Sequence, residues 1–207
     1  MPRKKKGQAK VISPDEFKRI LKIVSTSTYA KRDTLLLLMS FGLGLRVLEL
    51  ASLKIRHVMN EDGSINYTVK LPRTKGDKHR DVYIPEPSKD KRIERALREY
   101  VAERKKYCDI KRLPFTLEQP LFLSRKGTAF TNRTLQKRFQ TIYELAGIAG
   151  ASSHSGRRTF ATNLIENGVD IKAIQTLMGH SSIAMTAVYV DANPIRLRNV
   201  IANALYR

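Results

Sequence analysis

The stretch LLLLMSFGLGLRVLEL, residues 35–50, decides the fold. Its apolar first part is too short to span a bilayer and is interrupted by Gly42 and Gly44. The sequence therefore predicts a buried helix over about 29–41 and, after the glycines, a short helix over about 47–53.

An arginine stands directly after this apolar run. Arg46 precedes Glu49 by three residues, so the two side chains can lie on one face of the short helix. An arginine buried there needs a partner. One interpretation is a structural ion pair between the two residues. The other is an arginine aimed at a phosphate, with Glu49 holding its local frame.

The charge of the chain indicates what it binds. The 207 residues, enough for one domain or at most two small ones, include 39 Lys and Arg against 19 Asp and Glu, which gives a formal net charge of +20. A compact domain with this excess repels itself unless a polyanion is near, and DNA or RNA is the obvious polyanion. A charge that serves solubility, or binding to an anionic membrane, is the alternative.

Cysteine usage limits the setting. Cys108 is the only cysteine, so an intramolecular disulfide and a thiolate zinc cluster are both excluded. We expect a reducing, cytoplasmic location, in association with the nucleoid if the source is prokaryotic.

Local signals place further elements around the central stretch. Residues 1–12 are expected to form a flexible basic arm, after which Ser13 can cap a helix and Glu16 can complete a capping box. The remaining patterns predict strands at 64–72 and 80–85 around a polar turn, helices at 88–107 and from Thr131 to Gly147, three helices separated by glycines over 157–189, and a last helix from 194. The predicted fold class is α+β, mainly α-helical, with a small antiparallel β-sheet near residues 55–85.

The motif HSGRR, residues 154–158, opens one of the predicted helices. His154 and Arg157 are three residues apart and can share a helix face, and a helix start offers free N–H groups to an anion. The simpler interpretation is a phosphate-contacting turn of a helix-turn-helix protein. A zinc site built on His154 and His180 would lack a third ligand, so no metal is expected.

Two further places carry candidate polar groups. The turn between the predicted strands contains Lys75 and Lys78, each of which can be an ordinary solvated charge, and this is our expectation for Lys78. Near the end of the chain, GHSSIAMTAVY places His180 nine residues before Tyr189, among small and apolar residues.

These residues, taken in chain order, resemble those of the tyrosine recombinases, and the resemblance runs from about residue 13 to the end. The matching positions are Arg46, Lys75, His154, Arg157, Gly179 with His180, and Tyr189. The chain departs from the motif at Gly156 and Arg158, where the family often has Leu and His. It looks like a phage integrase, a chromosome-dimer resolvase or a fimbrial inverter.

The resemblance implies a domain organisation. Residues 13–207 are expected to form a tyrosine-recombinase catalytic domain. Most members of the family carry an additional N-terminal DNA-clamping domain, for which this chain has no room. We therefore expect a catalytic fragment or a compact member without a separate N-terminal core-binding domain.

The resemblance also implies the reaction. The phenol of Tyr189 attacks a DNA phosphorus, the 5′ oxygen leaves, and a 3′-phosphotyrosyl link keeps the bond energy. The reaction therefore needs no ATP, no metal and no other cofactor. Arg46 and Arg157 would stabilise the charge that develops on the non-bridging oxygens of the transition state.

Proton transfer falls to other residues of the motif. A phenol is mostly un-ionised at neutral pH, so His154 is expected to assist as a base and His180 to bind the phosphate. Lys75 is the candidate general acid for the leaving 5′ oxygen. Glu49 is kept as a supporting residue.

The remaining positive charge is expected to bind double-stranded DNA. The candidate contacts are the helix over 89–106 together with Arg3, Lys4, Lys5, Lys6, Lys78, Arg133, Lys137, Arg138 and Arg158. The resemblance further implies a homo-oligomer on DNA, from a dimer to a tetramer, in which the C-terminal helix 194–207 is exchanged between copies. Accessory DNA-binding proteins can join it, and no membrane is involved.

Two alternatives stay open. The first is a non-catalytic DNA-binding protein with a helix-turn-helix-like unit over 157–190, although a repressor has no reason to carry Arg46 together with Lys75. The second is a relaxing enzyme similar to the type IB topoisomerases, which share the catalytic layout more distantly.

Overall fold

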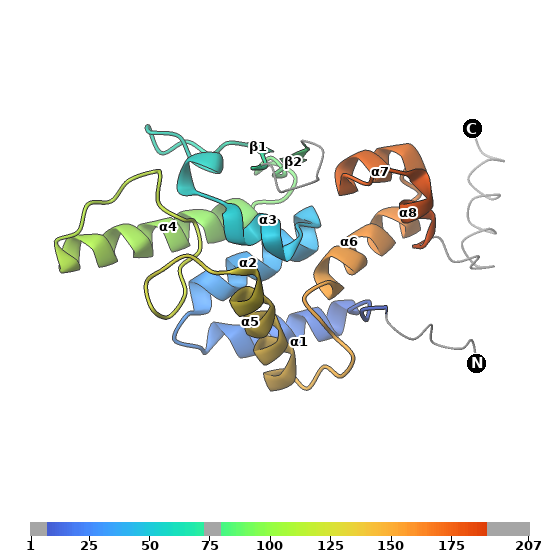
Figure 1. The fold of residues 1–207 in the computed structure, drawn as a ribbon, viewed down its shortest axis with the longest axis horizontal. Helices are drawn as coiled ribbons and strands as arrows, with labels where there is room; N and C mark the ends of the chain where they lie inside the picture. Colours follow the sequence, from blue (N-terminus) through green and yellow to red (C-terminus); the bar gives the residue numbers. More distant parts are fainter. Residues whose placement is uncertain (1–7, 73–79, 190–207) are drawn as a thin grey trace.

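Helix α2, Ala30–Leu43, lies at the centre of the fold (Figure 1). The computed structural model describes residues 8–72 and 80–189. Leu35, Leu36, Leu37 and Met39 are completely buried in α2, as expected for a helix that is apolar on all sides. Helices α1, α3, α4 and α6 all contact it. The buried helix predicted from residues 35–50 is therefore confirmed.

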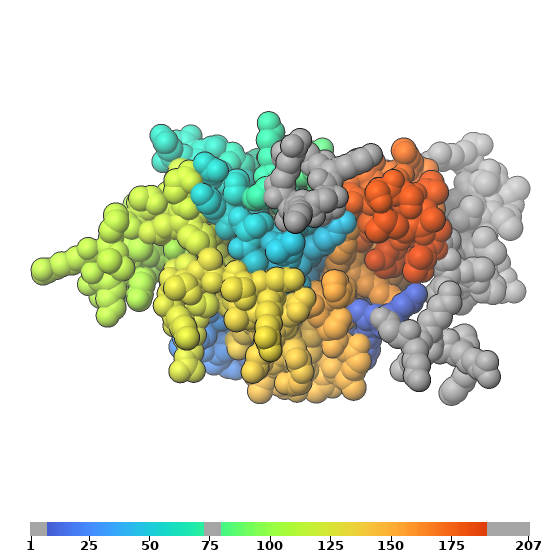
Figure 2. Space-filling view, in the orientation of Figure 1, coloured from blue at the N-terminus to red at the C-terminus, as the bar shows by residue number. Residues whose placement is uncertain are grey.

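Helices α1, α3, α4 and α6 lie around α2 (Figure 1). The long helix α4 reaches one end of the molecule, whereas α7 and α8 lie at the opposite end (Figures 1 and 2). The bounds are α1 Pro14–Ser25, α3 Val47–Ser52, the 3₁₀ helix η1 Ile55–His57, α4 Arg92–Lys111, α5 Asn132–Leu145, α6 Ser155–Glu166, α7 Ile171–Met178 and α8 Ile183–Ala187.

The predicted helix caps are present. The Ser13 hydroxyl accepts the backbone N–H of Glu16, and the Glu16 carboxylate accepts the N–H of Ser13, so the capping box at α1 is confirmed. Thr131 caps α5 in the same way. Helix α4 begins later than predicted and extends to Lys111, where Arg112 adopts a left-handed conformation with φ 54° and ends it.

A small sheet covers one side of the helical core. Strands β1, Thr68–Lys70, and β2, Asp81–Tyr83, pair antiparallel with Val69 opposite Val82. Both strands are shorter than the predicted 64–72 and 80–85. The predicted fold class, mainly helical with a small antiparallel sheet, is confirmed. The turn that carries Lys75 and Lys78 and the predicted helix from 194 lie outside the described residues.

Helices α6 and α7 enclose a second, smaller core. Ala161, Ile165, Ile174 and Met178 are buried there, and Tyr189 packs against them. Helix α6 approaches α2 closely because position 156 has no side chain. A Cβ atom on Gly156 would lie 2.2 Å from the Ser40 Oγ. This contact explains why the chain has glycine where the recombinase motif often has leucine.

Residues 8–12, the last part of the predicted basic arm, pack against the chain around α6. The N–H of Ile12 donates to the Thr159 Oγ1 at 2.9 Å, and the N–H of Lys10 donates to the Gly150 carbonyl at 3.1 Å. Figure 2 shows this segment, in blue, beside the orange and red helices α6–α8. Residues 1–7 lie outside the described part of the chain. In the part that is described, every helix is too short or too polar to cross a membrane.

Candidate active site

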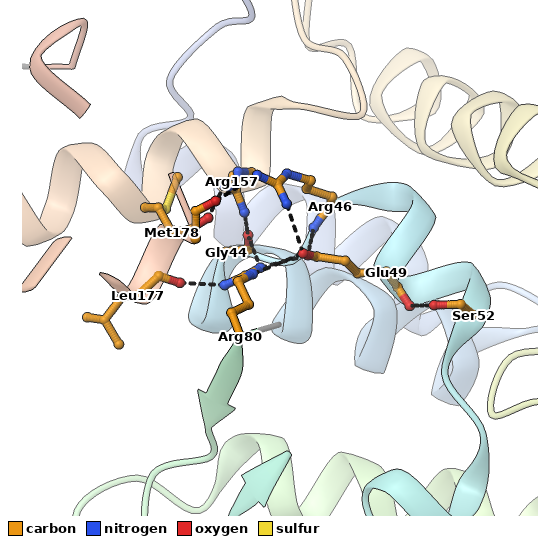
Figure 3. A network of polar contacts seen from close by, with 9 residues as sticks. Gly44, Arg46, Glu49, Ser52, Arg80, Arg157, Leu177 and Met178 are labelled. Carbon is orange, nitrogen blue, oxygen red and sulfur yellow. Dashed lines mark hydrogen bonds and ion pairs between the residues drawn. The ribbon is translucent and has the colours of Figure 1, made fainter. Parts of the chain in front are cut away.

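The carboxyl ends of two helices converge on one cluster of arginines (Figure 3). Helix α2 ends at Gly44 and α7 ends at Gly179, both in the left-handed conformation, with φ 62° and 59°. The last carbonyls of a helix have no partner within it. At these two ends the partners are guanidinium groups, which also suit the partial negative charge of a helix carboxyl end.

Arg157 joins the two helix ends. It lies in the first turn of α6 and is 6% exposed. Its Nη1 donates to the Gly44 carbonyl at 2.7 Å, and its Nη2 donates to the Met178 carbonyl. Burial and the nearby guanidiniums of Arg80 and Arg46 lower the pKa of Arg157 to about 9, so it stays protonated at neutral pH.

Arg46 is the more open member of the cluster. It caps α3, and its backbone N–H donates to the Glu49 Oε2 at 2.6 Å. Its Nη1 lies 3.3 Å from the Glu49 Oε1, and its Nη2 donates to the Gly179 carbonyl at 3.2 Å. The side chain keeps 25% of its surface exposed. The ion pair with Glu49 is therefore present, and the guanidinium still reaches the surface.

Arg80 is a third arginine of the cluster, which the sequence predictions missed. It is 8% exposed and binds both oxygens of Glu49, with Nε at 2.9 Å from Oε1 and Nη2 at 2.6 Å from Oε2. A signal for it was present in the sequence. Arg80, Val82 and Ile84 alternate along one strand, so they share its buried face.

His180 and Tyr189 lie against each other after α7. Their rings are stacked with centroids 6.0 Å apart and an interplanar angle of 8°. The Nδ1 of His180 is 2.9 Å from the Thr186 Oγ1, and Thr186 is fully buried. Burial, then the charges of the three nearby arginines, lower the pKa of His180 to about 4. The imidazole is therefore neutral at pH 7, with one N–H donor and one acceptor nitrogen.

A surface cavity of about 230 Å³ brings the predicted residues together. His154, an exposed residue at the start of α6, lines it with Arg46, Arg157 and Tyr189. The remaining wall is formed by Gln8, Ala9, Arg158 and Val188. The two arginines, 46 and 157, come from distant parts of the chain and meet beside the phenol, which is the arrangement that the resemblance implied.

The predicted DNA contacts fall into distinct environments. Arg133 and Lys137 are exposed on α5. Arg138 instead binds the carboxylate of Asp33, which is 0% exposed, through its Nε at 3.1 Å and its Nη2. Arg158 lines the cavity and donates to the Ala9 carbonyl. The predicted contacts Arg3, Lys4, Lys5, Lys6 and Lys78, and the predicted general acid Lys75, lie outside the described residues.

Comparison with known proteins gives curated relatives that are tyrosine recombinases. XerC of Vibrio cholerae serotype O1 is 29% identical over 204 residues, which cover 98% of this chain and 60% of the relative. XerD of Listeria monocytogenes serotype 4b is 31% identical over 201 residues, which cover 96% of this chain and 63% of the relative. The chain thus spans about three-fifths of the length of these proteins.

Solved structures with the same fold include two recombinases and an integrase. The crystal structure of XerA recombinase superposes with a TM-score of 0.72 at 28% identity, over 98% of this chain and 68% of that one. XerH recombinase bound to its difH substrate gives 0.68 at 27% identity, over 93% of this chain and 53% of that one. The catalytic domain of bacteriophage HP1 integrase shares the fold, with a TM-score of 0.63 at 22% identity over 94% of this chain and 95% of that one.

The family model described as the phage integrase family matches residues 10–196, a range that contains the arginine cluster and both members of the stacked His180–Tyr189 pair. A match over most of the chain, with the motif residues gathered at one cavity, leads to a single assignment: the chain belongs to the phage integrase family of tyrosine recombinases.

Proposed function

We propose that the chain carries the catalytic domain of a site-specific recombinase that cuts and rejoins DNA through a 3′-phosphotyrosyl intermediate. The observation that carries the proposal is the single cavity lined by Arg46, His154, Arg157 and Tyr189. Integration, excision, inversion and resolution all use this chemistry. The relatives named XerC and XerD and the DNA-bound structure of XerH support it.

The arginine cluster suits a transition state that concentrates negative charge. A phosphodiester carries one negative charge, and attack on phosphorus places more on the non-bridging oxygens. Arg157 and Arg46 are held by main-chain carbonyls before DNA arrives, so little reorganisation is needed when the charge develops. A guanidinium has five N–H donors, so Arg157 can keep its bonds to two carbonyls and still donate to a phosphate oxygen.

We assign each bond change and proton transfer of the cleavage step to a residue. The Oη of Tyr189 bonds to phosphorus as the bond from phosphorus to the 5′ oxygen breaks. The phenol proton passes to His154, and the leaving 5′ oxygen takes a proton from Lys75. His180, neutral at pH 7, can donate its Nε2–H to a phosphate oxygen when its Nδ1 accepts a hydrogen bond from the Thr186 hydroxyl.

Trapping the covalent intermediate tests this function. Duplexes drawn from the DNA that flanks the gene, each with a nick placed next to the cleavage position, would be incubated with the protein. A protein–DNA adduct that resists detergent is expected. It should be lost in Tyr189→Phe and retained in Tyr107→Phe, a matched change at an exposed tyrosine on α4.

Other results would favour the two alternative functions. Specific DNA binding without any adduct would support the non-catalytic DNA-binding protein. Relaxation of supercoiled DNA without preference for a site would support the type IB topoisomerase-like enzyme.

We also propose that the protein assembles on DNA as a homo-oligomer, from a dimer to a tetramer, with residues 194–207 exchanged between copies. Exposed apolar side chains on and after α8 support an interface at this end of the molecule. They are Ile183, Met185 and Val188, at 49%, 45% and 54% exposure. A variant that lacks 194–207 should form fewer multi-copy complexes in sedimentation with DNA but keep the thermal unfolding of the monomer. Unchanged assembly would contradict the exchange.

A further inference from the structure

Arg80 is placed where it can control the rest of the arginine cluster. It is almost completely buried, on the strand face that also carries Val82 and Ile84. A buried cation is costly unless every charge and donor is matched. Its donors end on one carboxylate and on the carbonyl groups of two helix ends, which are the same elements that hold Arg46 and Arg157.

The carboxylate of Glu49 is shared unequally between two arginines. Arg80 binds both of its oxygens, at 2.9 and 2.6 Å, in the paired geometry that a guanidinium and a carboxylate favour. The side chain of Arg46 reaches it only once, at 3.3 Å. Arg80 therefore satisfies most of this negative charge. Without Arg80, the buried carboxylate would turn further towards Arg46, with which it already forms an ion pair.

Arg80 also ties down the carboxyl end of α7. It donates to the Leu177 carbonyl, and its Nη2 lies 3.5 Å from the Gly44 carbonyl of α2 (Figure 3). Gly179 lies directly against it, since a Cβ atom there would come within 2.3 Å of the Arg80 Cδ. His180 is the next residue, so the position of this imidazole depends on where Arg80 lies.

We propose that Arg80 is a positioning residue for phosphoryl transfer: it competes with the Arg46 guanidinium for the Glu49 carboxylate and fixes the helix end from which His180 follows. This proposal rests on the proposed recombinase function. The proposal can be tested through the net charge of the cluster. Counted over the described part of the chain, the three arginines and Glu49 carry a net charge of +2. Arg80→Gln lowers this to +1, and adding Glu49→Gln restores +2.

The decisive experiment is a double-mutant cycle in single-turnover cleavage, on a nicked duplex that the wild-type protein cleaves. Arg80→Gln should cleave roughly 10²-fold more slowly, the loss typical of a misplaced reacting group. Arg80→Gln with Glu49→Gln should recover about ten-fold of that loss, because the competing carboxylate is gone. A double variant as slow as Arg80→Gln, or slower, would overturn the proposal.

A conservative variant separates geometry from charge. Arg80→Lys keeps the positive charge but cannot bind both carboxylate oxygens and the two carbonyls at once. It should remain at least about ten-fold slower than the wild type while being fully folded by circular dichroism. Wild-type cleavage by Arg80→Lys would show that charge alone suffices and would refute a positioning role.

A matched control accounts for lost stability. Arg104, on α4, is also buried, at 6% exposure, and its Nη1 donates to the carbonyls of Pro120 and Leu121. Arg104→Gln should lower the unfolding temperature much as Arg80→Gln does, but it should leave cleavage per folded molecule unchanged. An equal loss of cleavage in both variants would mean that Arg80 acts only through stability.

A spectroscopic measurement tests the arrangement without relying on activity. In the free protein, the ring signals of His180 can be followed by NMR as the pH changes. Arg80→Gln should raise the pKa of His180, since the Arg80 charge contributes to its lowering, whereas Arg80→Lys should raise it less. A shift in the pKa of His180, without any cleavage by the wild type, would disprove the proposed function but keep the influence of Arg80 on the imidazole. No shift in either variant would disprove that influence and with it the positioning role.

Discussion

A single methyl group at Gly44 provides a quantitative test of how α2 and α6 meet. Gly44 ends α2 with φ 62°, and its carbonyl accepts the Arg157 Nη1. A Cβ atom at this position would lie 2.4 Å from the Cδ1 of Phe160 on α6. Gly44→Ala therefore has two separate costs, one in the backbone and one in packing.

Both costs can be estimated. An alanine in the left-handed conformation costs about 1–2 kcal/mol. Overpacking against a side chain that must move costs about 1–3 kcal/mol more. Gly147→Ala is the matched control, because Gly147 has φ 64° but no atom within 4 Å of its added Cβ. We expect Gly44→Ala to lose about 2–5 kcal/mol of unfolding free energy, and Gly147→Ala only about 1–2 kcal/mol.

Urea unfolding followed by circular dichroism measures both variants. Phe160→Leu in the Gly44→Ala background should return part of the loss, because it shortens the side chain that the methyl group meets. Equal losses at Gly44 and Gly147, or no relief from the second change, would refute the close contact of the two helices. The cleavage rate per folded molecule should fall only in Gly44→Ala, whose carbonyl holds Arg157.

The remaining predictions concern other parts of the chain. The pKa of His180 is lowered from 6.5 to about 4 in the folded protein, so the unfolded chain binds a proton first as the pH falls. The contribution of the neutral His180 to the free energy of unfolding is therefore fully present above pH 6.5. It decreases as the pH falls towards 4, by up to about 3 kcal/mol. Urea unfolding over this range should show a smaller decrease for His180→Gln, and identical curves would contradict the lowered pKa. Gly156→Leu should lose at least about 2 kcal/mol of unfolding free energy, since its Cβ would meet the Ser40 Oγ, and a neutral effect would show that α2 and α6 separate easily. Arg138→Met should lose about 1.5–3 kcal/mol through its hydrogen bonds to Asp33. In DNA-binding titrations it should leave the dependence of log K on log salt unchanged, whereas a slope smaller by about one would favour the predicted phosphate contact.

Local signals in the sequence were sufficient for most of the helices. The capping residues Ser13 and Thr131 predicted where α1 and α5 begin, because a cap depends only on the few residues beside it. The apolar run of 35–50 predicted the central helix for the same reason. The end of α4 was missed because Arg112 ends it by a left-handed conformation that arginine rarely adopts.

The candidate site depends on contacts that local patterns do not contain. Arg46 and Arg157 are far apart in the chain, and only the family resemblance placed them together. Arg80 was missed because its role depends on tertiary partners, although its position on the buried face of a strand marked it as unusual. Arg138 was predicted as a DNA contact from charge alone, and the pattern around it did not reveal its bond to buried Asp33.

The two glycine turns at 44 and 179 also predict where the chain should not tolerate changes in length. Because backbone oxygens at these turns hold Arg157 and, together with Glu49, Arg46, one extra residue inserted in either turn would displace the cluster while leaving its composition intact. An insertion in the exposed turn at 125–128, which forms no hydrogen bond with the arginine cluster among the described residues, would change only a surface loop. Length variants of this chain should therefore survive at that loop and fail at the two glycines.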